Sequence, residues 1–493
     1  MDSLQKHDVY TLIPLSSLPK GEKILNTKFV FKKKLDGRFK ARLVVGEHRQ
    51  QPGLDYGRSY APVCRIGSIR MMLAIACHFG WPVYQADVVG AFLNAMCDRD
   101  VYVKPAPGDN SKHPTTGEPM VYQLRRALYG LSQSPILWND TLDTTLKVFG
   151  WNRTQSDPCV YVFKSGDTTV ILAVYVDDFL ITGEDSDLVN KNKTELTDTF
   201  EMTDLGEVER ILGIEVQRDY DQGTMTISQG HYVATILERF EMQAANPVST
   251  PGYGVEIPTE QPQDQLLGPA EKKLYQSITG SILYLAQGTR FDLSYTALQL
   301  SKACSNPARA HMTAAKHALR YLRGNPDLPI TYKTGQFKLV AFADASFGAN
   351  PDNGRSTTGY LFFLAGGLIS YGAKSQTLAA QSTVEAEIQA ISYAAREATY
   401  ISNFMKELKF KTFGSVPINS DSTGALTVAG NAMHSQRTKH VALRYFFIRE
   451  LVQRGQIELH HKPGERMLAD VATKFLPKPR FLSIVKQIQE FKC

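Results

Sequence analysis

The chain has 493 residues, of which 43% are hydrophobic and 21% are charged, and its formal net charge is +6. These values exclude a disordered or fibrous protein and are typical of a soluble chain with about two to four domains. The longest apolar runs, such as 170–176, are too short to span a bilayer, and the first residues lack a secretion-signal pattern. We therefore expect an intracellular protein without membrane segments.

Positive charge is concentrated near the start of the chain. The stretch 29–50 carries seven lysines and arginines against two acidic residues. Its Asp36-Gly37 pair lies between two β-prone runs and predicts a hairpin. Two interpretations remain open, a solvated hairpin surface and a patch that binds nucleic acid.

The six cysteines are scattered along the chain, and no two have C-x-x-C spacing. This pattern argues against a zinc site and against a disulfide framework. Free thiols in a reducing compartment are the expected state.

Up to about residue 248, short β-prone runs alternate with helical segments. We expect a helix over 70–79 and, over 121–150, a strand that is followed by a helix. Strands over 168–176 and 179–182 would form a tight hairpin. The Pro- and Gln-rich stretch 246–267 is typical of an exposed linker.

Beyond the linker, 271–323 is strongly helical with a break at 305–307, and Gly324 is the expected stop of its last helix. From residue 337 onward, strands and helices alternate, which predicts a layered α/β domain. The expected strands and helices there are 338–346, 357–373, 383–408, 418–422, 441–455 and 456–463.

Two adjacent carboxylates, Asp177 and Asp178, interrupt an apolar run at the tip of the expected hairpin. Like charges repel each other, but divalent cations offset that repulsion, and Mg²⁺ prefers hard oxygen ligands. A two-metal site needs a third acidic ligand. Asp87, which interrupts another apolar segment, is a candidate. Alternatively, the pair caps a solvent hairpin and Asp87 is a helix N-cap.

A second acidic set is spread over the C-terminal stretch. Asp344 lies in a strand, Glu387 in a helix, Asp421 at the end of a strand and Asp470 at the start of a short segment. Taken singly, each is compatible with a helix cap or a solvent-facing position. Glu385 is the alternative to Glu387.

Several stretches resemble the polymerase of copia-type LTR retrotransposons (Pseudoviridae). The YVDD motif at 175–178 matches the catalytic motif of reverse transcriptases, and 40–76, 85–95, 124–138 and 204–216 recur in the family's order. The stretches 342–387 and 437–474 resemble the ribonuclease H domain of the same Pol polyproteins. The set of motifs covers nearly the whole chain.

The resemblance implies a multidomain protein of α+β and α/β class. It implies a right-hand polymerase with fingers, palm and thumb, followed by a ribonuclease H-like domain with a mixed sheet. The expected domains are fingers and palm over 1–248, a linker with a helical thumb or connection over 249–330, and the ribonuclease H-like domain over 331–493.

The resemblance also implies roles for individual residues, among which Phe92 would exclude a 2′-hydroxyl from the incoming nucleotide. The implied catalytic and metal-binding residues are Asp87, Asp177 and Asp178 in the polymerase, and Asp344, Glu387, Asp421 and Asp470 in the nuclease. The implied nucleotide-binding residues are Lys40, Arg42, Phe92 and Gln133, and the implied primer grip is Leu212-Gly213. Each acidic set would hold two Mg²⁺ ions, with Mn²⁺ as an alternative. We expect His460 and His461 to be ordinary strand residues.

The implied function is RNA- and DNA-directed DNA synthesis with cleavage of RNA in RNA–DNA hybrids, both by two-metal phosphoryl transfer. The implied partners are an RNA template, a DNA primer-template, RNA–DNA hybrids, dNTPs and capsid-like particle proteins, in a cytoplasmic virus-like particle or the nucleus. Two alternatives remain. One is a decayed or domesticated copy that binds nucleic acid without catalysis, which Thr203 favours because relatives commonly have lysine there. The other is a Mg²⁺-dependent nuclease whose N-terminal half is only a scaffold.

Overall fold

The computed structural model describes residues 2–492 except 34–36, 38, 47–49, 54, 253, 336, 411, 412 and 431–441. The expected turn residue Asp36 and the basic residues Lys34, Arg38 and Arg49 lie outside the described residues. Two compact units are present, and they do not follow the order of the chain. The first contains Met1–Cys64 and Tyr84–Glu207, and the second contains Arg65–Val83 and Val208–Cys493. Within the described part of the chain, every helix is too short or too polar to span a bilayer.

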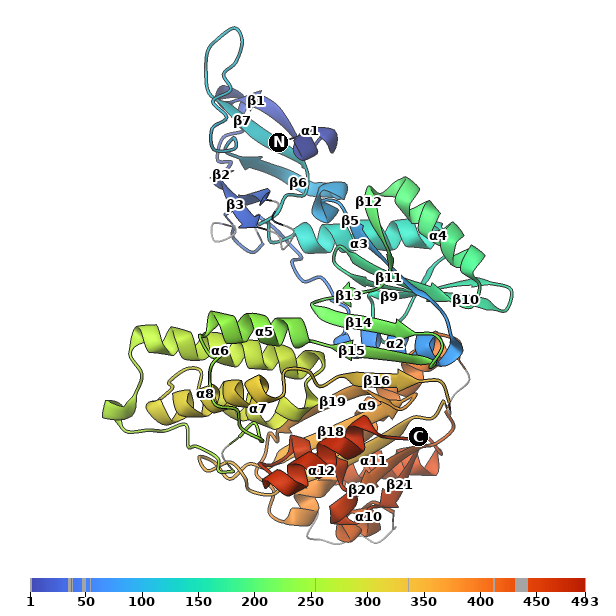
Figure 1. Cartoon of the computed structure of the whole chain (residues 1–493). Helices are drawn as coiled ribbons and strands as arrows, with labels where there is room; N and C mark the ends of the chain where they lie inside the picture. Colours follow the sequence, from blue (N-terminus) through green and yellow to red (C-terminus); the bar gives the residue numbers. More distant parts are fainter. Residues whose placement is uncertain are drawn as a thin grey trace. The chain divides into compact units, whose positions relative to one another are not determined.

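The first unit contains a four-stranded sheet, a separate hairpin and a larger sheet (Figure 1). The four-stranded sheet follows helix α1 (Asp2–Lys6), and its strand order is β1 (Tyr10–Pro14), β7 (Met120–Arg126), β6 (Met96–Val103), β2 (Ile24–Leu25). The hairpin pairs β3 (Thr27–Lys33) with β4 (Phe39–Val45) in antiparallel register. The hairpin expected over this basic stretch is confirmed.

The six-stranded sheet of the first unit has the order β12 (Met202–Glu207), β5 (Val83–Val88), β11 (Asp178–Gly183), β10 (Thr168–Tyr175), β9 (Val160–Ser165), β8 (Asn152–Arg153). Its central strand β10 is buried from Thr169 to Val174. Such a continuous apolar run is expected of a strand that is covered on both faces.

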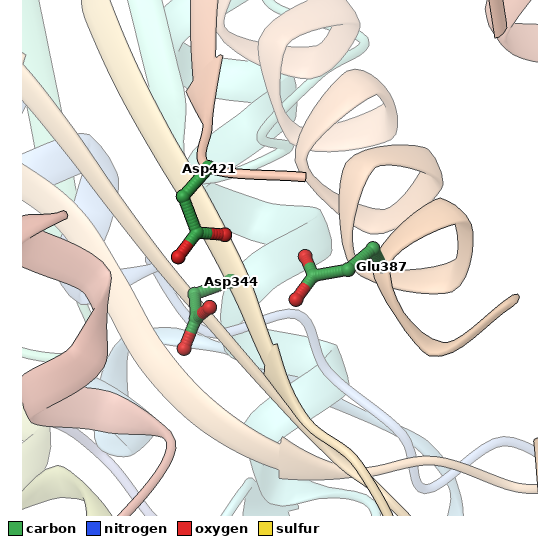
Figure 2. A group of neighbouring side chains, drawn as sticks. All are labelled: Asp344, Glu387 and Asp421. Carbon is green, nitrogen blue, oxygen red and sulfur yellow. The ribbon is translucent and has the colours of Figure 1, made fainter. Parts of the chain in front are cut away.

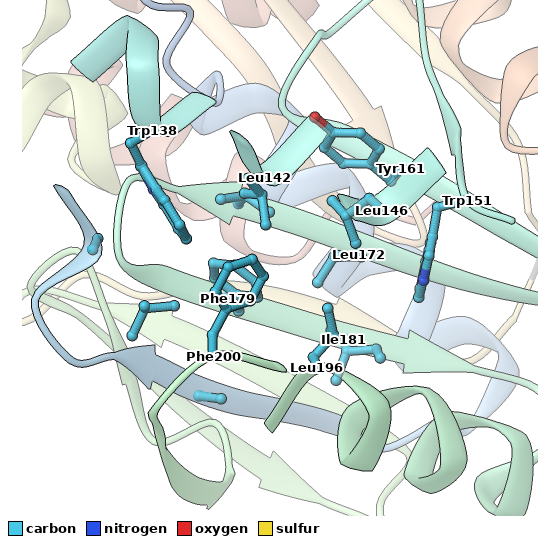
Figure 3. Packing of buried hydrophobic residues seen from close by; sticks show 14 of the residues in the cluster. Trp138, Leu142, Leu146, Trp151, Tyr161, Leu172, Phe179, Ile181, Leu196 and Phe200 are labelled. Atoms are coloured by element: carbon cyan, nitrogen blue, oxygen red, sulfur yellow. The ribbon is translucent and has the colours of Figure 1, made fainter. Parts of the chain in front are cut away.

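Helices α3 (Ser134–Val148) and α4 (Ser186–Thr199) contribute to the core beside this sheet (Figure 3). Trp138, Leu142 and Leu146 recur every four residues, so they share one face of α3 and pack together with residues of β10 and β11. The position of α3 is therefore fixed by core packing, which matters for the turn that joins β10 to β11.

The second unit begins with an inserted helix, α2 (Ile66–Phe79), which is buried from Ser68 to Cys77. A four-stranded sheet follows in the order β13 (Arg210–Ile211), β14 (Ile214–Asp219), β15 (Thr224–Ser228), β16 (Ile330–Lys333). Four helices lie between β15 and β16 in the chain, namely α5 (Gly230–Arg239), α6 (Pro269–Gly288), α7 (Ser294–Lys302) and α8 (Arg309–Gly324). The last of them ends at Gly324, as expected.

The C-terminal part of the second unit is built on a five-stranded sheet. Its order is β19 (Gly367–Ser375), β18 (Thr357–Leu364), β17 (Val340–Ser346), β20 (Val416–Ser420), β21 (Ile457–His461). Strand β18 is antiparallel to both neighbours, whereas β17, β20 and β21 are parallel, so the expected mixed sheet is present. The helices of this part are α9 (Thr383–Glu407), α10 (Thr423–Gly430), α11 (Ala442–Gln453), the 3₁₀ segment η8 (Leu468–Ala472) and α12 (Lys478–Gln489).

Candidate active sites

The first candidate site is the tight turn between β10 and β11. The pair Tyr175↔Asp178 closes the hairpin, so Val176 and Asp177 form the turn. Val176 has φ of 60°, a left-handed conformation that costs a β-branched residue about 1–3 kcal/mol. Its backbone carbonyl accepts a hydrogen bond of 2.8 Å from Nε1 of Trp138. The buried side chain of Trp138, which lies on α3, therefore holds the strained turn in place.

Asp87 lies beside this turn because β5 and β11 are neighbours in the sheet. The amide of Val88 donates a hydrogen bond of 2.9 Å to the backbone carbonyl of Asp177. Burial raises the pKa of Asp178 to about 6, and the charges of Asp177 and Asp87 add to the rise, while a hydrogen bond from Gln85 opposes it. The structure thus brings the three predicted carboxylates together (the N-terminal acidic cluster). Their mutual repulsion is the kind that a divalent cation relieves.

Tyr129, which the sequence analysis did not single out, connects two predicted nucleotide-binding residues to this cluster. Its ring centroid lies 4.9 Å from that of Phe92, and the guanidinium of Arg42 lies 5.3 Å from it. Burial raises the pKa of Tyr129, Arg42 opposes the rise, and Asp177 and Asp87 add to it. Tyr129 falls within the motif stretch 124–138, but a local pattern does not distinguish it from a core tyrosine.

The other two predicted nucleotide-binding residues lie on different elements. Gln133 is fully buried at the start of α3, where its Oε1 accepts a hydrogen bond of 3.0 Å from Gln50. The Nε2 of Gln133 has no hydrogen-bond partner. An unpaired buried donor is costly, so this group is available to a ligand oxygen. Lys40 lies on β4, opposite Lys32.

A cavity of about 350 Å³ adjoins the turn in the first unit. Its walls include the loop 59–63, the ring of Phe92, Trp138 of α3, and Val174 and Val176 of the hairpin. A volume of this size is typical of small-molecule sites. Phe92 therefore lines a space next to the acidic turn, where its ring restricts what can enter.

The predicted primer grip lies in the second unit, between β13 and β14. Leu212 and Gly213 both adopt positive φ, of 50° and 70°. The hydroxyl of Tyr284 donates a hydrogen bond to the carbonyl of Leu212. A side chain at Gly213 would collide with this hydroxyl, so glycine is required there.

The second candidate site contains Asp344 of β17, Glu387 of α9 and Asp421, which follows β20 (Figure 2). We call these three residues the C-terminal acidic cluster. Within the described part of the chain, they form the one group of three or more metal-ligating side chains whose ligand atoms all lie within 4.8 Å of one another. Because β17 and β20 are parallel neighbours, their carboxyl ends lie side by side, and this brings Asp344 and Asp421 together. Glu387 comes from the first turns of α9.

The electrostatics of this cluster are those of carboxylates that lack enough counter-charge. Burial raises the pKa of Glu387 to about 9, and Asp344 and Asp421 add to that rise. Burial likewise raises the pKa of Asp344 to about 6, although Lys474 opposes it. The Oε1 of Glu387 accepts a hydrogen bond of 3.2 Å from the amide of Ala345, while its buried Oε2 has no hydrogen-bond partner. An orphaned carboxylate oxygen facing two further carboxylates fits a divalent cation.

The predicted Asp470 lies near this cluster but is not one of the three residues whose ligand atoms are all within 4.8 Å of one another. Its charge adds to the rise in the pKa of both Asp344 and Asp421, which burial causes in the first place. Asp470 lies in η8, where it forms ion pairs with Lys474 at 2.6 Å and Arg480 at 3.1 Å. The Nζ of Lys474 also lies 3.7 Å from Asp344, so Lys474 bridges Asp470 to the cluster. The fourth acidic residue is therefore paired with two cations and still lies close enough to Asp344 and Asp421 to interact with their charges.

The structure also shows where Glu385 and His461 lie relative to the C-terminal acidic cluster. Glu385 is half-buried at the first turn of α9, and its Oε2 accepts a hydrogen bond of 2.7 Å from the amide of Gln381. Of the two candidate glutamates, Glu387 alone joins the C-terminal acidic cluster. Burial raises the pKa of Asp421, Asp470 adds to the rise, and His461 of β21 lies close enough to oppose it.

Several known proteins are similar to this chain over most of its length. The family model described as reverse transcriptase (RNA-dependent DNA polymerase) matches residues 7–253. The retrovirus-related Pol polyprotein from transposon TNT 1-94 of Nicotiana tabacum is 36% identical over 98% of this chain. The corresponding polyprotein from transposon RE1 of Arabidopsis thaliana is 35% identical over 95% of this chain. The matches cover 36% and 32% of those proteins, so the chain spans about a third of their length.

A shorter relative and one solved structure are also similar. The putative transposon Ty5-1 protein YCL074W of Saccharomyces cerevisiae is 34% identical over 58% of this chain and 92% of its own length. The crystal structure of RNase H1 from Halobacterium salinarum NRC-1 covers 28% of this chain and 94% of its own, with 16% identity and a TM-score of 0.22. This last likeness is too weak to support an argument.

Proposed function

Because the chain belongs to the reverse transcriptase (RNA-dependent DNA polymerase) family of copia-type transposon Pol polyproteins, we propose that it synthesises DNA on RNA and DNA templates and cleaves RNA in RNA–DNA hybrids. The observation that carries the polymerase is the convergence of Asp87 with Asp177 and Asp178 inside the matched residues 7–253. Primer extension on poly(rA)–oligo(dT) with dTTP and Mg²⁺ tests it.

In the proposed polymerase, each residue near the N-terminal acidic cluster has a separate task. Asp87 and Asp177 would hold the metal ions, with Asp178 as a weaker third ligand. The ring of Phe92, supported by Tyr129, would occupy the space of a ribose 2′-hydroxyl. Arg42 and Lys40 would bind the triphosphate, and the unpaired Nε2 of Gln133 would donate to the nucleotide.

The proposed ribonuclease H activity rests on the C-terminal acidic cluster. Asp344, Glu387 and Asp421 would hold the metal ions, because their oxygens already lie within 4.8 Å of one another. Asp470, whose charge already acts on Asp344 and Asp421, would be the fourth acidic ligand. At both clusters, a bound pair of Mg²⁺ ions supplies activation of the attacking oxygen and neutralisation of the leaving phosphate. Release of short fragments from a labelled RNA strand in a hybrid tests this activity.

The proposal extends to the architecture. In it, the small sheet and the β3–β4 hairpin are fingers, the six-stranded sheet is the palm, and α5–α8 supply the thumb or connection. Domains over 1–248, 249–330 and 331–493 remain part of the proposal, with Leu212-Gly213 as primer grip. We also propose action on an RNA template, a DNA primer-template and dNTPs inside the cell, in a particle with capsid-like proteins or in the nucleus.

We expect Phe92→Val to admit ribonucleotides. The smaller side chain would open the wall of the cavity beside the acidic turn and remove the steric penalty on a 2′-hydroxyl. The ratio of dTTP to rUTP incorporation should fall by about 10–100-fold, equivalent to about 1.4–2.7 kcal/mol of lost discrimination. Phe79→Val, at an exposed phenylalanine in the second unit, is the matched control. Unchanged sugar selectivity in Phe92→Val would remove Phe92 from this role.

We expect Trp138→Phe to lower primer extension about 5–10-fold without unfolding the protein. Phenylalanine still fills much of the core, but the hydrogen bond to Val176 is lost, at about 1 kcal/mol. Without it, the strained turn that presents Asp177 relaxes, and small displacements of catalytic groups are costly. Trp151→Phe, in the same core, is the control because the Nε1 of Trp151 has no hydrogen-bond partner. Equal activity in the two variants would argue against a positioning role for Trp138.

A further inference from the structure

Five aromatic side chains gather on the surface of the second unit, and no role described above uses them. Phe79 is the last residue of α2, Trp81 follows it closely, Phe337 precedes β17, and Phe410 and Phe413 lie between α9 and β20. We call these five residues the aromatic patch. Phe79 is 44% exposed, and the other four side chains are half-buried. Contiguous exposed apolar side chains of this kind mark interaction sites.

The rings of the aromatic patch stack on one another. The ring centroid of Phe79 lies 5.1 Å from that of Trp81 and 5.5 Å from that of Phe410, and both pairs are stacked. The ring of Phe337 stacks on His78, with 4.7 Å between the centroids. These contacts use ring faces, so ring edges remain for a partner. Because a platform for unpaired bases needs open ring faces, the patch is better suited to apolar side chains than to bases.

The rim of the aromatic patch is basic. Lys338 directly follows Phe337, Lys409 directly precedes Phe410, and both lysines are exposed. The acidic residue of the same segment, Glu407, is half-buried and has a partner of its own. Two copies of this chain that met at the patch would place like charges against each other, which is costly. The charges therefore disfavour a second copy as the occupant and favour an acidic partner.

A cavity of about 250 Å³ continues from the segment that carries the last ring of the patch. Its wall includes Gly414, which directly follows Phe413. The described lining contains Lys406, Arg454 and several hydroxyl and amide side chains, and no acidic residue. Arg454 pairs with Glu450 at 2.5 Å, whereas Lys406 forms no ion pair with the described residues. The cavity therefore offers a positive charge and hydrogen-bond donors to a carboxylate.

We propose that the aromatic patch and this cavity together bind a segment of a partner protein in which large apolar side chains alternate with aspartates or glutamates. The apolar side chains pack on the ring edges, and a carboxylate enters the cavity at Lys406. Apolar burial supplies most of the affinity, while the basic rim and the cavity select for negative charge. The net charge of the chain, +6, also attracts such a segment. The patch is thus a docking surface that is separate from both acidic clusters.

The test is the fluorescence anisotropy of a short fluorescein-labelled peptide, in which leucine and tryptophan alternate with aspartate and glutamate, titrated with the full chain. We expect Phe79→Ala to raise the Kd about tenfold, because it removes a central ring of the patch. Lys406→Gln should raise the Kd about threefold, because it removes one partly exposed charge contact. Added KCl should weaken peptide binding by the wild-type chain more than by Lys406→Gln. Primer extension and hybrid cleavage should be unchanged in both variants.

Two residues of α12 provide matched controls in the same unit. Leu482→Ala is the control for Phe79→Ala, because Leu482 is also 44% exposed. Lys486→Gln is the control for Lys406→Gln, because it too removes one exposed lysine. Both controls should bind the peptide with the wild-type Kd, and melting curves should show all four variants folded.

A wild-type chain that does not bind the peptide, or a folded Phe79→Ala variant that binds it with the wild-type Kd, overturns the inference. Equal binding of a peptide with lysines in place of its acidic residues does so as well. If Phe79→Ala loses binding to labelled oligo(dT) but keeps binding to the peptide, the patch is a site for single-stranded nucleic acid. If sedimentation shows a wild-type dimer that Phe79→Ala dissociates and Leu482→Ala does not, the occupant is a second copy. Either of these results overturns the inference too.

Discussion

Asp177→Asn is expected to reduce primer extension about a thousandfold while the protein stays folded. The substitution removes one negative charge from the N-terminal acidic cluster and keeps the shape of the side chain. Loss of a ligand that would hold both metal ions removes about 4 kcal/mol of transition-state stabilisation. The turn itself should persist, because its contacts to Val88 and Trp138 use backbone atoms of Asp177 and Val176. The measurement is the rate of dTTP incorporation on poly(rA)–oligo(dT).

Asp167→Asn is the control for this experiment. Asp167 is exposed in the turn between β9 and β10, at the opposite end of the same strand. The Asp167→Asn variant should extend primers at the wild-type rate. Asp177→Asn should still cleave hybrid RNA, because the C-terminal acidic cluster belongs to the other unit. Equal extension by wild type and Asp177→Asn would contradict the role assigned to Asp177, and no extension by either protein would favour a copy that binds nucleic acid without catalysis.

Local signals in the sequence were enough to predict many of the elements. The Asp-Gly pair predicted the β3–β4 hairpin, and the apolar spacing with Gly324 predicted α8. The position of α2 could not be predicted, because it depends on contacts distant in sequence. Arg70 of α2 donates a hydrogen bond of 3.2 Å to the carbonyl of Gly288 and lies 4.4 Å from the ring of Tyr371. A helix buried on nearly all sides does not reveal its partners through its own periodicity.

The same distinction between local signals and contacts distant in sequence applies to the candidate sites. The paired carboxylates in an apolar run indicated the position of Asp177, because strand interiors rarely contain unpaired charge. Asp344 was indicated only as one of the four acidic residues that the resemblance implies. The choice between Glu385 and Glu387 required the helix register against β17, which a single sequence does not reveal. Tyr129 was missed because its contacts to Phe92 and Arg42 join three separate elements. The pairing of Asp470 with Arg480 also depends on how η8 meets α12.

Glu387→Gln is expected to abolish cleavage of hybrid RNA and, without divalent metal, to raise the melting temperature at pH 8. Burial raises the pKa of Glu387 to about 9, far above its value in an unfolded chain, so ionisation is disfavoured in the fold. A carboxyl group whose pKa is higher in the folded than in the unfolded protein stabilises the fold at low pH. That contribution is lost as the pH rises from the unfolded pKa to the folded pKa. Glutamine has no such cost, and its Oε1 can still accept the hydrogen bond from Ala345. Each kcal/mol relieved should raise the melting temperature of a unit of this size by about 1–2 °C.

Magnesium should reverse the order of stability between the two proteins. A cation that binds the folded wild-type cluster stabilises it by mass action, and the variant has one fewer charge to bind it. Glu385→Gln, two residues away on the same helix, is the control, because Glu385 lies outside the C-terminal acidic cluster and its carboxylate accepts a hydrogen bond from the amide of Gln381. It should keep hybrid cleavage and the magnesium-dependent rise in melting temperature, and both glutamine variants should extend primers normally. If Glu387→Gln cleaves hybrid RNA at the wild-type rate, or if magnesium stabilises it as much as the wild type, the C-terminal acidic cluster is not a metal site, because its most strongly perturbed carboxylate would then be dispensable.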